Sequence, residues 1–238
     1  MKPFLLLISL CSGWAQGAWA QSFCASDGQA TPVALVERFI SADCEACWSA
    51  AQTSKTSARA LTLDWIVPSK QGDDAPLSAA ASRDALMRLH TLGRAAPTAS
   101  SIGTTRVIGG RADRLRVAHG VPLGGYIGAS IELHTTPKAF RGESLSAWLV
   151  LVETIPAGTD GTATARNLVR NVLLSPWNKR DSLSKSKQLV VRETRPLSIP
   201  QGATPERLRV VGWVQDARGR ILTAAQSVCA APNQAVVE

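Results

Sequence analysis

Two cysteines near the start of the chain could carry out redox chemistry. Cys44 and Cys47 form a C-x-x-C pair, whose thiols lie close enough to cycle between dithiol and disulfide. The apolar run Val33–Ile40 precedes the pair, and a stretch rich in alanine and polar residues follows it. A strand, a C-x-x-C pair and then a helix is an order typical of dithiol redox sites. The same pair could also be a structural bridge or part of a metal site.

The positions of the two cysteines predict different roles in disulfide exchange. Cys44 begins the predicted helix, where free backbone N–H groups favour a thiolate, so we expect it to be the attacking thiol. Cys47 lies one turn further along and is expected to resolve the mixed disulfide. Glu37 interrupts the preceding apolar strand and is a candidate catalytic proton acceptor for Cys47, or else a carboxylate paired with an arginine. Asp43 and Glu45 flank Cys44, and their charges disfavour a thiolate there.

The N-terminus predicts export. Lys2 precedes the apolar run Phe4–Leu10, which is too short to span a membrane. Ala18-Trp19-Ala20 matches the small-residue signal for cleavage. We therefore expect residues 1–20 to be a removable signal peptide and the protein to be periplasmic or secreted. No other segment is apolar enough to cross a membrane, so no membrane association is expected after cleavage.

The remaining cysteines fit an oxidising compartment. Cleavage of the signal peptide would remove Cys11 and leave Cys24, Cys44, Cys47 and Cys229, which allow three pairings. The C-x-x-C pair can close locally. That leaves Cys24 and Cys229 for a structural disulfide joining the first mature residues to the far end of the fold.

Charge and motifs argue against several function classes. The chain carries a formal charge of +8 in 238 residues, but its cationic residues are scattered. The densest group has few aromatic neighbours and no base-reading motif, so we interpret it as a solvated face and predict no nucleic-acid partner. There is no G-x-S-x-G elbow, no P-loop and no dinucleotide-binding fingerprint, and no organic cofactor is implied. This basic group is Arg106, Arg111, Arg114 and Arg116.

Apolar periodicity and turn residues divide the mature chain into two regions. Residues 21–112 are predicted to form an α/β domain, whose first two strands run parallel if the helix between them crosses over. Residues 113–238 are predicted to form a β-rich region packed on that domain. The first region is expected to contain strands at Val33–Ile40, Leu61–Val67 and Thr104–Ile108, and helices at 45–57 and 77–92. The second is expected to contain strands at Arg114–Ala118, Tyr126–Leu133, Ala147–Val152, Asn167–Leu174, Leu189–Thr194, Leu208–Gln215 and Arg220–Ala225. Ala217–Arg220 is predicted to be the hairpin turn between the last two strands.

The segment Val36–Cys47 resembles a family of secreted bacterial proteins that is catalogued as a domain of unknown function. Similar segments occur at Ala147–Val150, Asn167–Val172 and Val214–Leu222, so the resemblance spans nearly all of the mature chain. The resemblance implies a thioredoxin-like N-terminal domain followed by a β-rich region. It also implies a thiol–disulfide oxidoreductase whose partners are thiols or disulfides of other proteins.

Two positions depart from the family pattern and favour other functions. The family's proline-containing segment corresponds to Thr104–Gly110, which has no proline, and Thr62 stands where the family has a histidine. The departures favour a non-catalytic binding or scaffold protein with structural disulfides. A further alternative is copper binding, because two thiolates select a soft ion such as Cu(I). The histidines available as additional ligands, none at recognisable ligand spacing, are His90, His119 and His134.

Overall fold

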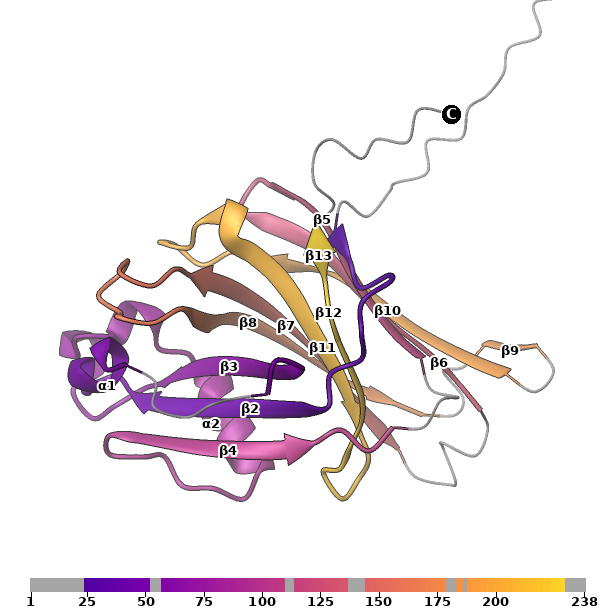
Figure 1. Ribbon diagram of the computed structural model, residues 1–238, viewed down its shortest axis with the longest axis horizontal. Helices are drawn as coiled ribbons and strands as arrows, with labels where there is room; N and C mark the ends of the chain where they lie inside the picture. Colours follow the sequence, from indigo (N-terminus) through magenta and orange to yellow (C-terminus); the bar gives the residue numbers. More distant parts are fainter. Residues whose placement is uncertain are drawn as a thin grey trace, which may run out of the picture.

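The chain forms mainly β-strands, arranged in two sheets (Figure 1). The computed structural model describes residues 24–51, 57–109, 114–136, 144–178, 183–185 and 188–229. Strand accounts for 53% and helix for 13%, so the predicted α/β, thioredoxin-like fold class is wrong. The predicted signal peptide, Cys11 and the predicted domain boundary at residue 112 lie outside the described residues.

The larger sheet draws strands from both predicted regions. β2 (Ala34–Ser41) and β3 (Ala60–Val67) are parallel, as predicted, with Ala34 opposite Ala60. β3 is also parallel to β8 (Arg166–Trp177) on its other side, whereas the remaining neighbours are antiparallel. The fold class therefore differs from the prediction. Through β8, a run of antiparallel strands from the second half of the chain joins the parallel pair of β2 and β3 in one sheet. In spatial order the seven strands are β12 (Ile221–Gln226), β11 (Leu208–Gln215), β7 (Leu145–Ile155), β8 (Arg166–Trp177), β3 (Ala60–Val67), β2 (Ala34–Ser41) and β4 (Ser100–Arg106).

The smaller sheet brings the two ends of the described chain together. All of its neighbouring strands are antiparallel, and the first described strand pairs with the last. In spatial order the six strands are β13 (Val228–Cys229), β1 (Cys24–Ala25), β5 (Arg114–Leu123), β6 (Tyr126–Thr135), β10 (Gln188–Ser198) and β9 (Leu183–Lys185).

One large cluster of the core lies between the two sheets. On β7, Leu149 and Leu151 belong to the cluster between the sheets, whereas Trp148 and Val150 belong to a second cluster on the opposite face. Because successive side chains of a strand point to opposite faces, residues 147–152 of β7 are apolar on both faces. The sheets approach closely at Gly212 of β11, where an added Cβ would lie 2.6 Å from a methyl group of Val117.

Two α-helices occur in the described residues, and both are shorter than predicted. α1 (Glu45–Ser49) ends because Ala50 is extended, with φ −60° and ψ 141°. α2 (Arg83–Thr91) is preceded by its N-cap residue Ser82, whose backbone is extended and whose side-chain oxygen accepts the N–H of Asp84. None of the helices in the described ranges is long and apolar enough to cross a membrane. The short 3-10 turns are η1 (Gly72–Asp74), η2 (Ser78–Ala80) and η5 (Pro205–Arg207).

Most of the predicted strands are present, with shifted ends. The segment 167–174 is a strand, as predicted, within the longer β8. β4 begins at Ser100, four residues before the predicted start at Thr104. The predicted hairpin between β11 and β12 is confirmed: one oxygen of Asp216 accepts the N–H groups of both Arg218 and Arg220.

Candidate functional site

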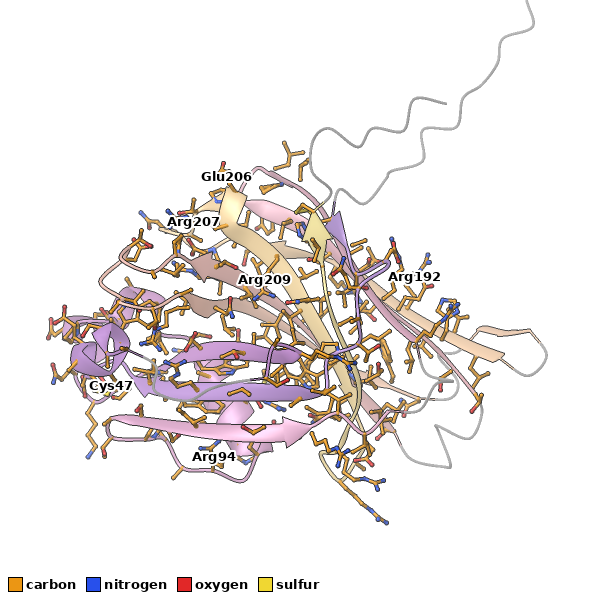
Figure 2. All side chains as sticks on the ribbon, viewed as in Figure 1. Cys47, Arg94, Arg192, Glu206, Arg207 and Arg209 are labelled. Carbon is orange, nitrogen blue, oxygen red and sulfur yellow. A yellow bond between two sulfur atoms is a disulfide. The ribbon has the colours of Figure 1, made fainter. Side chains whose placement is uncertain are left out.

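The C-x-x-C pair forms a disulfide at the start of α1. The Cα atoms of Cys44 and Cys47 are 5.2 Å apart, and both residues are half-buried. Asp43 and Glu45 are exposed, and the carboxylate of Asp43 accepts a hydrogen bond from the hydroxyl of Ser69 at 2.6 Å. Figure 2 shows Cys47 on α1, at one end of the seven-stranded sheet. The disulfide therefore has one side against the protein and the other toward solvent.

An apolar cluster supports the inner side of this disulfide. Cys44 and Cys47 pack against buried residues that include Ile40, Ile66 and Trp48. The indole N–H of Trp48 donates to the carbonyl oxygen of Asp160 at 2.7 Å, which fixes the ring against the loop between β7 and β8. A cavity of about 250 Å³ opens beside this ring. Its apolar lining includes Ile66, Leu77, Ala80, Ile155 and Leu168.

Arg166, at the start of β8, anchors the end of α1. One guanidinium nitrogen donates to the carbonyl oxygens of Cys47 at 3.3 Å, Trp48 at 2.6 Å and Ala50 at 2.8 Å. These carbonyls belong to the end of a helix, where no intrahelical donors are available. The guanidinium carbon also lies 5.3 Å from the centre of the Trp48 ring. Arg166 is 1% exposed, so a buried positive charge lies directly beneath the C-x-x-C helix.

Asp64 of β3 supplies the negative charge that faces Arg166. One carboxylate oxygen lies 3.7 Å from Arg166 and 3.2 Å from Arg38, and the other accepts the N–H of Asn167 at 2.8 Å. Asp64 is fully buried. Burial raises the pKa of Asp64, and the charge of Arg38 opposes that rise. Burial also lowers the pKa of Arg38. One carboxylate thus neutralises part of two guanidinium charges below the disulfide.

Glu37 is paired with an arginine, as predicted by the alternative to its catalytic role. Its two carboxylate oxygens accept hydrogen bonds from Arg88 at 2.8 and 2.7 Å, and both side chains are buried. The neighbouring Leu35 and Phe39 belong to the cluster under α2, whereas Ile40 packs on the opposite face with the disulfide. Strand alternation places Glu37 on the α2 face, so the structure does not bring it to the cysteines. Its catalytic role stays a prediction.

The second cysteine pair forms the predicted disulfide. Cys24 and Cys229 are bonded across β1 and β13, with Cα atoms 4.0 Å apart and a sequence separation of 205. Cys24 is buried, and Cys229 is exposed. His119 of β5 lies opposite Cys24 on the other side and is buried. Burial lowers the pKa of His119, so the imidazole is neutral at pH 7.

The histidines lie away from the C-x-x-C pair. In the part of the chain that the structure describes, His119 joins Cys24 and Cys229 in one group of potential metal ligands, and no such group includes Cys44 or Cys47. His90 is exposed on α2, and His134 contacts a carboxylate oxygen of Glu132 at 2.5 Å. The described residues therefore bring no histidine to the C-x-x-C pair to complete a copper site there.

Sequence reasoning missed Asp64 and Arg166, although one signal was available. Asp64 interrupts the apolar strand Leu61–Val67 in the same way that Glu37 interrupts the strand before it. A charged residue inside a buried strand needs a partner of opposite sign. Arg166 comes from a segment about a hundred residues further along the chain, so its pairing with Asp64 is visible only in the folded structure.

Comparisons with known proteins assign no family. No family model and no curated protein matches the chain. Among solved structures, HBP35 of Porphyromonas gingivalis is similar with a TM-score of 0.47 and 10% sequence identity, over 82% of this chain and 74% of that one. A likeness at this level assigns no function. The family resemblance at Val36–Cys47 accordingly stays an expectation.

Proposed function

We propose that the protein exchanges disulfides with other proteins in an oxidising compartment outside the cytoplasm, through Cys44 and Cys47. The observation that supports this proposal is the position of their disulfide, half-buried at one end of the sheet. It closes a loop with a sequence separation of only 3, so opening it leaves the strand pairing of both sheets in place. Both disulfides are consistent with export.

The exchange conserves atoms and electrons between the two proteins. A thiolate of the partner attacks one sulfur of the Cys44–Cys47 bond and forms a mixed disulfide, and the other cysteine leaves as a thiolate. A second thiolate of the partner then attacks the mixed disulfide. The partner becomes oxidised by two electrons, and the two cysteines take up two protons to become thiols. The reverse sequence would reduce a disulfide of the partner.

Two features of the site support this chemistry. The positive charge of Arg166 lies 3.3 Å from the carbonyl oxygen of Cys47 and favours a negative charge on a nearby sulfur. The exposed carboxylates of Asp43 and Glu45 oppose that effect, but solvent screens them more than it screens a buried charge. The cavity beside Trp48, whose ring packs in the same cluster as both cysteines, offers a recess for a side chain of the partner.

A binding or scaffold role is the second candidate, and a different surface favours it. The turn between β5 and β6 exposes large apolar side chains: Val121 is 60% exposed, Leu123 81% and Tyr126 54%. Neighbouring apolar side chains on a turn are typical of a contact surface for another protein. In this case, both disulfides would only stabilise the fold.

Disulfide exchange with a model dithiol separates the two candidates. The rate is measured for the wild type, for Cys44→Ser, and for the double variant Cys24→Ser/Cys229→Ser as the matched control. Exchange chemistry predicts that Cys44→Ser abolishes turnover, while the control retains it. A Cys44–Cys47 bond that resists reduction by glutathione, with equal background rates in all three proteins, would leave only the structural role.

A further inference from the structure

Three potential metal ligands form a row across neighbouring strands of the smaller sheet. Cys24 of β1 lies directly opposite Cys229 of β13 on one side and His119 of β5 on the other. Figure 1 shows the yellow strand β13 beside the indigo N-terminal strand. Residues that lie opposite each other in an antiparallel sheet point to the same face. Consistent with this, the two sulfurs and a ring nitrogen of His119 all lie within 4.8 Å of one another.

The ring of His119 is oriented as a ligand would be. Its Nδ1 lies 2.9 Å from the carbonyl oxygen of Gly120. A carbonyl only accepts, so Nδ1 carries the hydrogen and Nε2 carries the free lone pair. Nε2 is buried and has no hydrogen-bond partner within the described ranges. Metal-binding histidines are commonly held in this way, with one nitrogen fixed by a backbone carbonyl and the other directed at the metal.

We propose that the dithiol form of Cys24 and Cys229 binds one Cu(I) ion together with Nε2 of His119. A dithiol reductant first gives two electrons and two protons to the Cys24–Cys229 bond and becomes a disulfide itself. Cu(I) then displaces the two thiol protons and is held by two thiolates and one imidazole. Soft thiolates select Cu(I), and the described residues supply three ligands, whereas structural zinc sites have four.

Backbone hydrogen bonds keep the row aligned without the disulfide. Next to Cys24, the N–H of Ser26 donates to the carbonyl of Val117 at 2.9 Å, and the N–H of Val117 donates to the Ser26 hydroxyl at 3.0 Å. Next to Cys229, the N–H of Ser227 donates to the carbonyl of Val210 at 2.8 Å, and the N–H of Val210 donates to the Ser227 hydroxyl at 2.9 Å. The segment of Cys24 therefore stays tied to β5 of the smaller sheet, and the segment of Cys229 to β11 of the larger sheet, when the sulfurs are reduced.

The test uses the full chain with Cys11, Cys44 and Cys47 replaced by serine, which leaves one cysteine pair. The result is then independent of the disulfide exchange proposed for Cys44. The protein is reduced with a phosphine and titrated anaerobically with Cu(I) against a colorimetric chelator. We expect one Cu(I) per chain in the reduced form and none in the oxidised form. X-ray absorption should show two sulfur ligands and one nitrogen ligand.

A pair of histidine variants tests the geometry. His119→Asn retains a side-chain N–H that can reach the Gly120 carbonyl but lacks a group equivalent to Nε2. It should weaken Cu(I) binding by about tenfold or more, since changes even to the outer shell of a metal site cost about 10–100-fold. His90→Asn, at an exposed position, is the matched control and should bind as the parent does.

Three outcomes would overturn the proposal. The first is equal binding by the oxidised form. The second is equal affinity of His119→Asn and His90→Asn. The third is loss of the far-ultraviolet circular dichroism of a β-rich fold on reduction, because the row of ligands would then not exist in the dithiol state.

Discussion

The guanidinium of Arg88 lies over two neighbouring tryptophan rings while it binds Glu37. Its Nη2 lies 2.7 Å from Oε2 of Glu37, and its central carbon lies 4.8 Å from the Trp148 ring and 5.0 Å from the Trp213 ring. The two rings are stacked on each other, with centroids 5.4 Å apart. A third partner, Gln215, accepts from Nη1 of Arg88 at 3.1 Å. The ion pair thus joins β2, α2 and β11 inside the cluster under α2.

Replacing Glu37 with glutamine should destabilise the fold. The amide keeps the shape of the carboxylate but removes the charge, so the buried guanidinium of Arg88 loses its counter-ion. Breaking a buried ion pair in this way costs about 3–5 kcal/mol, measured as the free energy of unfolding in urea. Glu45→Gln, at an exposed position, is the control and should change stability by about 0.5 kcal/mol or less. A near-neutral Glu37→Gln with a slower, pH-shifted exchange rate would instead support the proton-acceptor role.

Replacing Arg166 with methionine should release the end of α1. The variant removes the donors to three carbonyls of residues 47–50 and one of the two cations facing Asp64. We expect a loss of about 3 kcal/mol or more in unfolding free energy and faster amide hydrogen exchange in residues 45–50. Arg195→Met is the control, because Arg195 forms an exposed ion pair with Glu193, worth about 1 kcal/mol or less. Unchanged amide protection in α1 would contradict the anchoring role of Arg166.

The two disulfides should differ in what they contribute to stability. In the chain-entropy model, the bridge between Cys24 and Cys229 stabilises by about 5 kcal/mol, because its sequence separation is 205. The bridge between Cys44 and Cys47, with a separation of 3, gives about 2 kcal/mol in the same model. Urea unfolding of the two double serine variants, with a chelator present, measures both values. An equal loss in the two variants would show that loop length does not set the difference.

His119 should make the oxidised protein less stable in mild acid. Burial lowers the pKa of His119 in the folded state below its ordinary value of 6.5, while the hydrogen bond to Gly120 opposes the shift. Below that value the unfolded chain binds a proton that the folded chain does not, so unfolding becomes easier as the pH falls. The free energy of unfolding that neutral, buried His119 contributes is fully present above pH 6.5. It is lost as the pH falls toward the pKa of His119 in the folded state.

Unfolding free energies at about pH 7.5 and about pH 5.5 test this linkage. His119→Asn should show a smaller loss of stability between the two conditions than the wild type, and His90→Asn the same loss as the wild type. An identical pH dependence in all three proteins would assign the effect to other groups.

Local features were predictable from the sequence, because they depend on neighbouring residues. The apolar run before the C-x-x-C pair forms β2, and Asp216 and Gly219 form the predicted hairpin turn. The disulfide partners followed from one local pair and the two cysteines that remained. The alanine-rich stretch after Cys47 was expected to be a long helix, yet α1 stops at Ser49, where Arg166 binds its last carbonyls. That capping residue is remote in sequence.

The fold class was not predictable, because it depends on which distant strands pair. A parallel strand pair joined through a helix is compatible with several sheets. Here Asp64 of β3 lies opposite Leu168 of β8, and through β8 the sheet continues into β7 and β11. Nothing in the local pattern of β3 specifies this neighbour. The same non-local pairing brings Arg166 beneath the C-x-x-C helix, so the missed fold class and the missed site residue have one cause.

The neighbouring positions of β1 and β13 set an order for folding. β13 lies at the edge of its sheet and pairs with β1, which precedes it by about two hundred residues. During synthesis, this edge stays incomplete until residue 229 has left the ribosome, whereas β2 and β3 can pair much earlier. Contacts between such distant segments are slow to form because a long loop must close first. The Cys24–Cys229 bond therefore joins the first and last described strands, and in the native sheet it forms only when β13 has paired with β1.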